Sequence, residues 1–141
     1  MSVITFQFTK KVLLVETTLK EVIEDVAKAE SLQFMTLEEG ADLACIKLSH
    51  ADLRNAIMQG ANFKNASLRE CDLYAAQLED ADFTGADLTG TDFSFANLHN
   101  VNFTNAILNN CDFSNCDTSS CDFTGTCKEE EHNNGNNQIF K

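Results

Sequence analysis

The side chains of this chain that could do chemistry are carboxylates, cysteine thiols and three histidines. Four of the carboxylates recur at a spacing of twenty residues, at Asp52, Asp72, Asp92 and Asp112. A catalytic pair of carboxylates converges in one pocket, whereas a fixed spacing places equal groups side by side along a surface. The spacing therefore predicts a straight row of negative charge. Such a row repels nucleic acid and attracts basic protein surfaces.

The histidines and cysteines form no recognisable catalytic or metal-binding motif. His50, His99 and His132 belong to no triad. The six cysteines include no Cys-x-x-Cys pair, the spacing typical of a zinc site. We therefore expect no enzyme activity, no metal and no other cofactor.

The elements that position these side chains come from a repeat of five residues, which runs from Ala41 to Gly125 without insertion or deletion. Each unit reads small, Asp or Asn, Leu or Phe, polar, polar. A period of five residues fits neither a strand nor an α-helix, and a short fixed repeat predicts a solenoid whose coils pack on one another. The small residue and the central Leu or Phe would fill a narrow core, and the other positions would face water.

In tandem, the unit A-(D/N)-(L/F)-x-x resembles the pentapeptide-repeat family, and the resemblance covers residues 41–125. It implies a β solenoid, namely a right-handed quadrilateral β-helix with one unit on each side of a coil. Residues 41–127 would then make about four coils. Four places depart from the consensus, and we expect altered local packing there, most of all at Thr118. They are Ile46-Lys47, Ala66-Ser67, Ala106-Ile107 and Cys116-Asp117-Thr118.

A four-sided coil predicts that residues twenty positions apart stack in columns, one on each face. The central residues of the first face are Leu43, Phe63, Phe83, Phe103 and Phe123, and those of the second face are Leu48, Leu68, Leu88 and Leu108. The third face carries Leu53, Leu73, Phe93 and Phe113, and the fourth carries Met58, Leu78, Leu98 and Thr118. Phenylalanine is confined to the first and third faces, which are opposite each other. Columns of like side chains favour a coil of twenty residues.

Two classes of cysteine follow from the repeat. Cys45 and Cys127 lie outside the inward positions, so we expect them to be the reactive thiols. The other four take the small inward position, where a thiol acts as a compact apolar group. These four are Cys71, Cys111, Cys116 and Cys121.

The third face carries the candidate binding surface of a chain whose formal net charge is −12. The aspartates of the row directly precede inward residues, so they point outward. Tyr74 and Phe95 also take outward positions on this face, one coil apart. Exposed aromatic side chains beside charge are typical of a contact patch, and we expect Arg54 and Arg69 on the adjacent faces. A solvated face is the other interpretation, because Asp and Asn also suit tight turns. The candidate binding residues are Asp52, Asp72, Asp92, Asp112, Tyr74 and Phe95.

An N-terminal segment, residues 1–40, precedes the repeat. Alternating side chains predict strands at residues 3–8 and 12–15, and a capping box at Thr18-x-x-Glu21 starts a predicted helix that ends near Glu30. This unit would cover the open first coil, and it loosely resembles the N-terminal part of small phage- and prophage-encoded pentapeptide proteins.

Residues 31–40 are either a linker or degenerate first repeats with Leu32 and Leu37 inward. At the other end, residues 128–141 form a polar tail whose composition favours disorder. The last coil, centred on Phe123, has no comparable cap, and this predicts a homodimer through the C-terminal coil.

Two functions of different classes are open, and the family resemblance implies the first. Some members of the family resemble B-form DNA in shape and charge and bind DNA gyrase or topoisomerase IV. This chain would then be a non-catalytic, acidic, protein-binding DNA mimic that does not itself bind nucleic acid. The alternative is a structural or scaffolding protein of a phage particle or other assembly, with contacts made by the ends and the N-terminal cap. No apolar run is long enough for a membrane span and no leader pattern is found, so we expect a cytoplasmic protein.

Overall fold

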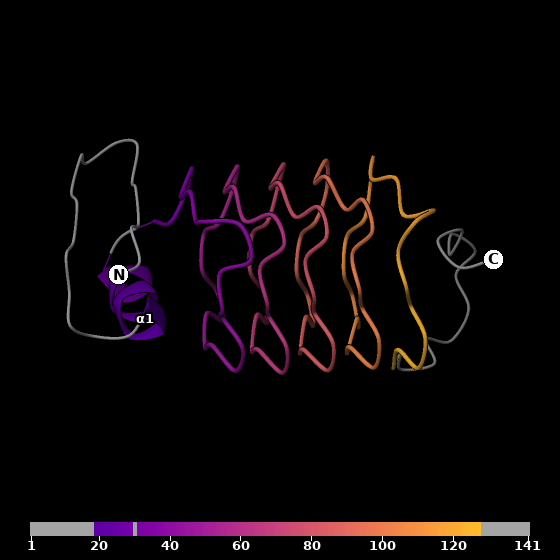
Figure 1. Ribbon diagram of the computed structural model, residues 1–141, viewed down its shortest axis with the longest axis horizontal. Helices are drawn as coiled ribbons and strands as arrows, with labels where there is room; N and C mark the ends of the chain where they lie inside the picture. Colours follow the sequence, from indigo (N-terminus) through magenta and orange to yellow (C-terminus); the bar gives the residue numbers. More distant parts are fainter. Residues whose placement is uncertain (1–18, 30, 128–141) are drawn as a thin grey trace.

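The computed structural model describes residues 19–29 and 31–127, which form one helix followed by a stack of coils (Figure 1). The helix, α1, spans Leu19–Ala29 and has Glu21 in its first turn and Lys28 in its last, which suits the helix dipole. The predicted strands at 3–8 and 12–15, the capping residue Thr18, the helix end at Glu30 and the tail lie outside the described residues.

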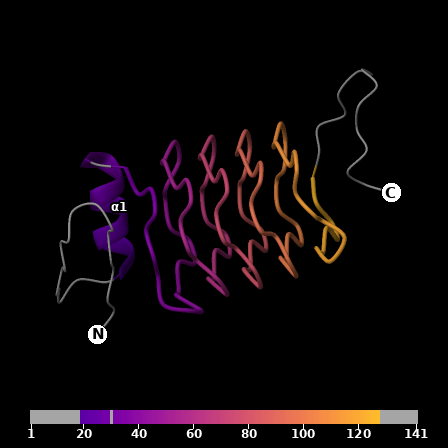
Figure 2. The same ribbon diagram turned by 90° about the horizontal axis from the view of Figure 1, so that it is seen from above.

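Each coil takes twenty residues and has four sides, and Figure 2 shows the coils following one another along the rod. Parallel bridges join the second residue of a unit to that of the unit four places later. Successive sides of one coil pair in this way as Asp42 with Asn62, Lys47 with Ser67, Asp52 with Asp72 and Ile57 with Gln77. Each side is thus one rung of a parallel ladder, so the predicted stacking at intervals of twenty residues is confirmed.

The corners between the sides explain why Asp, Asn and Gly recur. The fifth residue of a unit lies in the left-handed region, for example Asn55 at φ 57° and Asn105 at φ 56°, which Asn and Gly adopt at least strain. The Asp or Asn at the second position accepts a hydrogen bond from the backbone N–H two residues later. Asp72 accepts one from Tyr74 at 3.1 Å, and Asn62 accepts one from Lys64 at 3.1 Å. The aspartates therefore do have the turn role that the sequence suggested.

Two phenylalanine columns fill the middle of the core. Phe63 and Phe83 stack with ring centroids 4.8 Å apart on the first face, and Phe93 and Phe113 stack at 5.1 Å on the third. The columns meet edge to face across the core, as between Phe83 and Phe93 at 5.9 Å. Confinement of phenylalanine to two opposite faces therefore lets the flat rings stack along the rod and meet edge to face across it.

Residues 31–40 belong to the coil and are not a linker. Leu32 is fully buried and Leu37 is 6% exposed, so both point inward as expected. Thr36 pairs with Ile57, a separation of twenty-one residues, whereas Asp42 and the following units pair at twenty. One extra residue just before Gly40 therefore shifts the repeat by one position. The coil thus begins at residue 31, and the boundary at residue 40 does not separate two structural units.

Helix α1 lies across the start of the first coil in both ribbon views (Figures 1 and 2). Ile23 is fully buried in the core, and Ala27, one turn later, packs partly buried against it. Glu24 lies between them in sequence and accepts a hydrogen bond from the backbone N–H of Lys47 at 2.8 Å. The helix thus packs apolar side chains against the core. Its Glu24 carboxylate accepts a hydrogen bond from a backbone N–H at the open edge of the ladder.

The departures from the consensus have unequal effects. At the first three places the backbone ladder is regular, because Lys47, Ser67, Asp87 and Ile107 form an unbroken column of bridges. At Cys116-Asp117-Thr118 the expected disturbance is confirmed, because Asp117 makes no bridge within the described residues. The N–H of Asn100 donates instead to the Ser120 hydroxyl at 2.9 Å.

Candidate protein-binding surface

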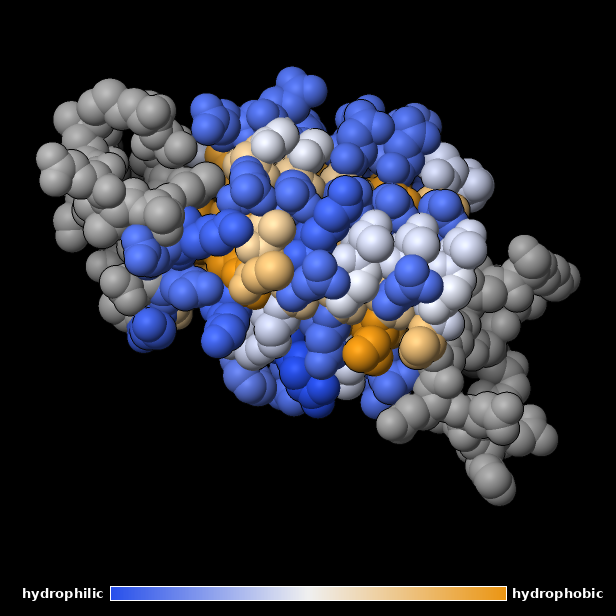
Figure 3. Space-filling view, turned by 60° about the horizontal axis from the view of Figure 1, so that its bottom comes forward, coloured by the Kyte–Doolittle hydropathy of each residue, from blue (hydrophilic) through white to orange (hydrophobic). Residues whose placement is uncertain are grey.

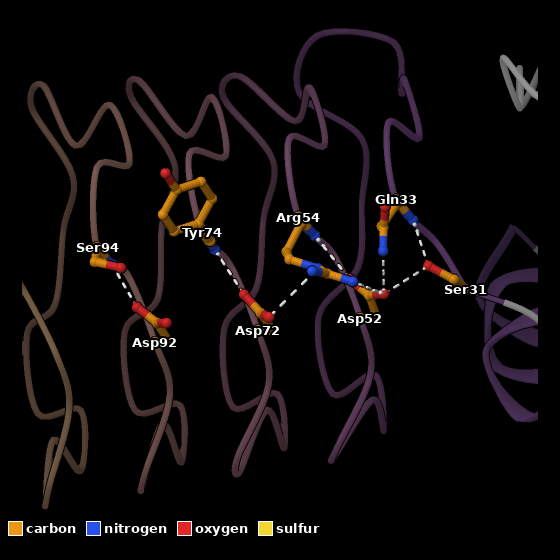
Figure 4. A network of polar contacts seen from close by, with 8 residues as sticks. All are labelled: Ser31, Gln33, Asp52, Arg54, Asp72, Tyr74, Asp92 and Ser94. Carbon is orange, nitrogen blue, oxygen red and sulfur yellow. Dashed lines mark hydrogen bonds and ion pairs between the residues drawn. The ribbon is translucent and has the colours of Figure 1, made fainter.

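The four aspartates of the third face lie in one row across successive coils, and Figure 4 labels the first three of them, Asp52, Asp72 and Asp92. Parallel bridges link Asp52 to Asp72, Asp72 to Asp92 and Asp92 to Asp112. Neighbouring members are therefore about 4.8 Å apart along the rod, the spacing of paired strands. The structure thus brings all four together as a row rather than converging them in a pocket.

Arg54 divides this row into two halves. Its guanidinium donates to both oxygens of Asp52, from Nε and Nη2 at 2.9 Å each, and Nε lies 3.4 Å from Oδ2 of Asp72. Ser31 and Gln33 also donate to Asp52. The hydrogen bonds from Arg54, then from Gln33 and Ser31, hold the pKa of Asp52 well below its usual range although partial burial opposes this. Arg54 therefore lies on the third face itself, and its expected place on an adjacent face is wrong.

The other half of the row has no arginine between its carboxylates. Asp92 and Asp112 each accept a backbone hydrogen bond at 2.8 Å, from Ser94 and Ser114. Hydrogen bonds from Ser114 lower the pKa of Asp112. Among residues 19–29 and 31–127, no cationic group pairs with either carboxylate. Within the described part of the chain, both carboxylates thus lack a cationic partner and are available to an external cation.

Tyr74 and Phe95 lie together beside this open half. Their ring centroids are 5.4 Å apart, and their exposed fractions are 40% and 53%. They are the exposed large hydrophobic side chains of the described part of the chain. Most of the face in Figure 3 is hydrophilic, and its hydrophobic areas are small and separate. The aromatic pair is therefore an exception on a polar rod.

Charge is also distributed unevenly along the rod, which the sequence reasoning missed. Residues 31–69 hold four Lys or Arg and four Asp or Glu, whereas residues 70–127 hold ten Asp or Glu and no Lys or Arg. Ion pairs take up cations of the first half, as Lys64 with Asp82 at 3.0 Å and Arg69 with Asp87 at 3.0 Å. The signal was already present in the positions of Lys and Arg. The C-terminal half of the rod is thus the acidic half.

The inward cysteines serve the core. The thiols of Cys71 and Cys111 donate to carbonyls of the preceding coil, at 2.8 Å and 3.0 Å, and burial raises the pKa of each to about 12. Cys45 and Cys127 are exposed, as their positions predicted. The described residues contain no group of three or more side chains that could hold a metal ion, and no helix among them is long and apolar enough to cross a membrane.

Comparisons with known proteins agree with this architecture. A pentapeptide repeat protein from the Arabidopsis thaliana thylakoid lumen has 34% identity over 73% of this chain and 64% of its own, with a TM-score of 0.57. HetL of the cyanobacterium Nostoc has 28% identity over 72% of this chain and 47% of its own, with a TM-score of 0.42. QnrB1, a plasmid-mediated fluoroquinolone resistance protein, has 22% identity over 67% of this chain and 61% of its own, with a TM-score of 0.37. The chain spans less than two thirds of the length of each.

No protein with curated functions matches the sequence. Two family descriptions do match it, "Pentapeptide repeat region" over residues 56–131 and "Pentapeptide repeats (8 copies)" over residues 39–69. Proteins of this family form right-handed quadrilateral β-helices, which is the four-sided coil described above. The repeat, the ladder of twenty-residue coils and these matches together show that the chain belongs to the pentapeptide-repeat family.

Proposed function

We propose that this protein is a non-catalytic binding module whose acidic rod occupies the DNA-binding surface of a DNA-handling enzyme such as a type II topoisomerase. The proposal rests on one observation: residues 70–127 contain ten acidic residues and no basic residue. A narrow rod with charge of one sign presents a surface comparable to the phosphates of a duplex, and enzymes that bind DNA carry the complementary basic surface. The resemblance to gyrase-binding family members suggests the class of enzyme.

The uneven distribution of charge also indicates which half of the rod would contact the enzyme. The N-terminal half of the rod, residues 31–69, has equal numbers of acidic and basic residues and so contributes little long-range attraction. Cations of the N-terminal half pair with Asp72, Asp82 and Asp87 of the C-terminal half, and the other acidic residues of the C-terminal half carry the attraction. The enzyme would bind along the C-terminal half, where Asp92 and Asp112 are open. Binding would then weaken as salt screens these charges.

A competition experiment tests the proposal. Purified DNA gyrase is bound to a fluorescent duplex, and anisotropy is followed as the full-length protein is added. We expect displacement that weakens between low and physiological salt. The double variant Asp92→Asn/Asp112→Asn should displace the duplex less well, while Asp42→Asn/Glu39→Gln, an equal charge change in the N-terminal half of the rod, should have the smaller effect.

These variants isolate charge from folding. Asn62 and Asn102 already accept the same turn hydrogen bond through Oδ1, so an Asp→Asn change keeps that bond. Absence of displacement by the native protein at low salt would contradict the proposed function with gyrase. Displacement that is insensitive to salt and to both variants would contradict the acidic surface as its cause.

Homodimerisation through the C-terminal coil is a second proposal. Cys111, Cys116, Cys121 and Phe123 are only partly buried, whereas Phe103, one coil earlier, is fully buried. A second copy packed on this end would lengthen the rod and cover the core. We expect a dimer mass in light scattering and a monomer for Phe123→Asp. A monomer mass for the native protein at micromolar concentration would contradict the homodimer. It would also count against a scaffold protein that makes contacts through its ends.

A cytoplasmic location accords with a DNA-handling partner, and it is likewise a proposal. Fractionation of cells that express the full chain would test it, with recovery in a membrane or exported fraction as the contrary result.

A further inference from the structure

The row of aspartates forms a series of equivalent slots, each between the carboxylates of two successive coils. The first slot, between Asp52 and Asp72, is filled by the chain's own Arg54 (Figure 4). Its guanidinium pairs bidentately with the nearer carboxylate and also reaches the next coil. Planar, two-pronged donation of this kind is specific to arginine. The fold itself thus shows that such a slot holds a guanidinium.

The slot between Asp92 and Asp112 repeats the same backbone two coils further on. Ser94 stands at the place of Arg54, forty residues later in the same column. The chain therefore supplies no guanidinium to this slot, and no cation pairs with its carboxylates among the described residues. In the slot between them, the place of Arg54 is taken by Tyr74.

Phe95 lies at the corner beside the empty slot, and its ring contacts Tyr74, which stands at the place of Arg54 in the slot before it. Phe95 follows Ser94 directly and has φ 61°, a left-handed conformation that is unfavourable for a bulky side chain. It is also 53% exposed and leans against Tyr74 rather than into the core. A large aromatic ring at a strained, solvent-facing corner is disfavoured by both folding and solubility. A binding role accounts for it.

A guanidinium can bind both the open carboxylates and the exposed aromatic rings. It bonds carboxylates in its plane and stacks on aromatic rings with its faces, whereas a lysine ammonium acts as a point charge. We propose that Asp92, Asp112, Tyr74 and Phe95 form a subsite for an arginine side chain of the partner protein. This inference rests on the proposed function, and it specifies which basic side chain of the partner is recognised there.

The chain carries its own reporter for this subsite. Tyr74 is its single tyrosine and there is no tryptophan, so fluorescence excited at the tyrosine band comes from the subsite. The probe is a capped peptide of alternating glycine and arginine, titrated into the full-length protein, with the lysine counterpart as the matched probe. We expect the arginine peptide to change Tyr74 fluorescence and to bind about threefold or more tighter than the lysine peptide.

Three variants test the parts of the subsite, with calorimetry as a readout that does not need Tyr74. Phe95→Asn, a residue common at this corner, should abolish the preference for arginine. Asp92→Asn/Asp112→Asn should weaken both peptides. Ser94→Arg, which should fill the slot as Arg54 fills the first, should weaken the arginine peptide, while Ser94→Gln should weaken it less. Unchanged melting curves show that each variant is folded.

Equal affinity for the two peptides, or a preference that survives Phe95→Asn, would overturn the subsite. The gyrase competition is separate from this result. If the peptides do not discriminate but the duplex is still displaced, the proposed function stands and the arginine subsite is wrong. If the peptides discriminate but the duplex is not displaced, the subsite stands and its partner is not gyrase.

Discussion

The carboxylate of Glu24 accepts a hydrogen bond from the backbone N–H of Lys47 at a distance of 2.8 Å. In the following coils the equivalent N–H donates to a carbonyl of the coil before it, as Ser67 donates to Ile46 at 2.9 Å. The first full coil has no such predecessor on this side, so a side chain of α1 supplies the acceptor. An uncapped ladder edge would invite pairing with another chain.

Replacing Glu24 with alanine is therefore expected to destabilise the protein by about 1 kcal/mol, because the N–H of Lys47 loses its acceptor. Thermal unfolding measures the loss, and amide exchange at Lys47 should become faster. Glu24→Gln keeps an acceptor oxygen and should behave closer to the native chain. Equal exchange at Lys47 in all three proteins would contradict this role for Glu24.

A second prediction concerns the corner at Gly85, which has φ +69°. A Cβ at this position would lie 2.5 Å from Oδ1 of Asn65, so that side chain would have to move. Gly85→Ala should destabilise by roughly 1–2 kcal/mol, from the left-handed backbone and the displaced amide together. Gly40→Ala is the matched control, because its φ is +75° but a Cβ there meets nothing within 4 Å. An equal loss of stability in the two variants would rule out the contact with Asn65.

Acid should weaken the fold through Asp52. The pKa of this carboxyl is depressed in the folded state, chiefly by the hydrogen bond from Arg54. A depressed pKa stabilises the fold above the unfolded value, about 3.9, and this stabilisation is lost as the pH falls toward the folded value. Partial burial alone would raise the pKa values of Asp82 and Asp87, but hydrogen bonds from Thr84 and Thr89, together with Lys64 and Arg69, lower both, so they act in the same direction.

The test compares melting temperatures at about pH 5 and about pH 3, on either side of the ordinary Asp pKa. The native chain should lose more stability over this interval than Arg54→Met, which removes the hydrogen bond that contributes most to the depressed pKa of Asp52. An equal drop in the two proteins would show that the pair with Arg54 does not contribute to the pH dependence.

Thiol accessibility gives a fourth prediction. Cys45 and Cys127 are exposed, whereas burial raises the pKa of Cys121 to about 11 and of Cys71 and Cys111 to about 12, and it also raises the pKa of Cys116. Because the thiolate is the reactive form, two of the six thiols should react rapidly with a disulfide reagent in the folded protein. All six should react in denaturant, and Cys45→Ser should remove one fast equivalent. Fast reaction of Cys71 in the native chain would contradict the buried position.

The sequence by itself determined the coil. A repeat of five residues with a small and a bulky inward position has one regular solution, and the columns at twenty-residue spacing follow from it. Phe83 and Phe93 could therefore be placed on opposite faces, and the break at Thr118 could be predicted, before any coordinates. The first repeats were not recognised in the sequence because one extra residue lies before Gly40. This residue shifts the five-residue pattern by one position, but the coil continues through it.

Tertiary structure alone decided how the charges are used. The sequence shows four equivalent aspartates. Only the structure shows that the Arg54 guanidinium binds the carboxylates of Asp52 and Asp72, whereas Asp92 and Asp112 have no such partner within the described residues. The ring contact between Tyr74 and Phe95, and the hydrogen bond from the N–H of Lys47 to Glu24, were likewise seen only in the structure. A local repeat specifies the backbone and the direction of each side chain. The reach and pairing of long side chains depend on what the neighbouring coil presents, and that neighbour is twenty residues away in the sequence.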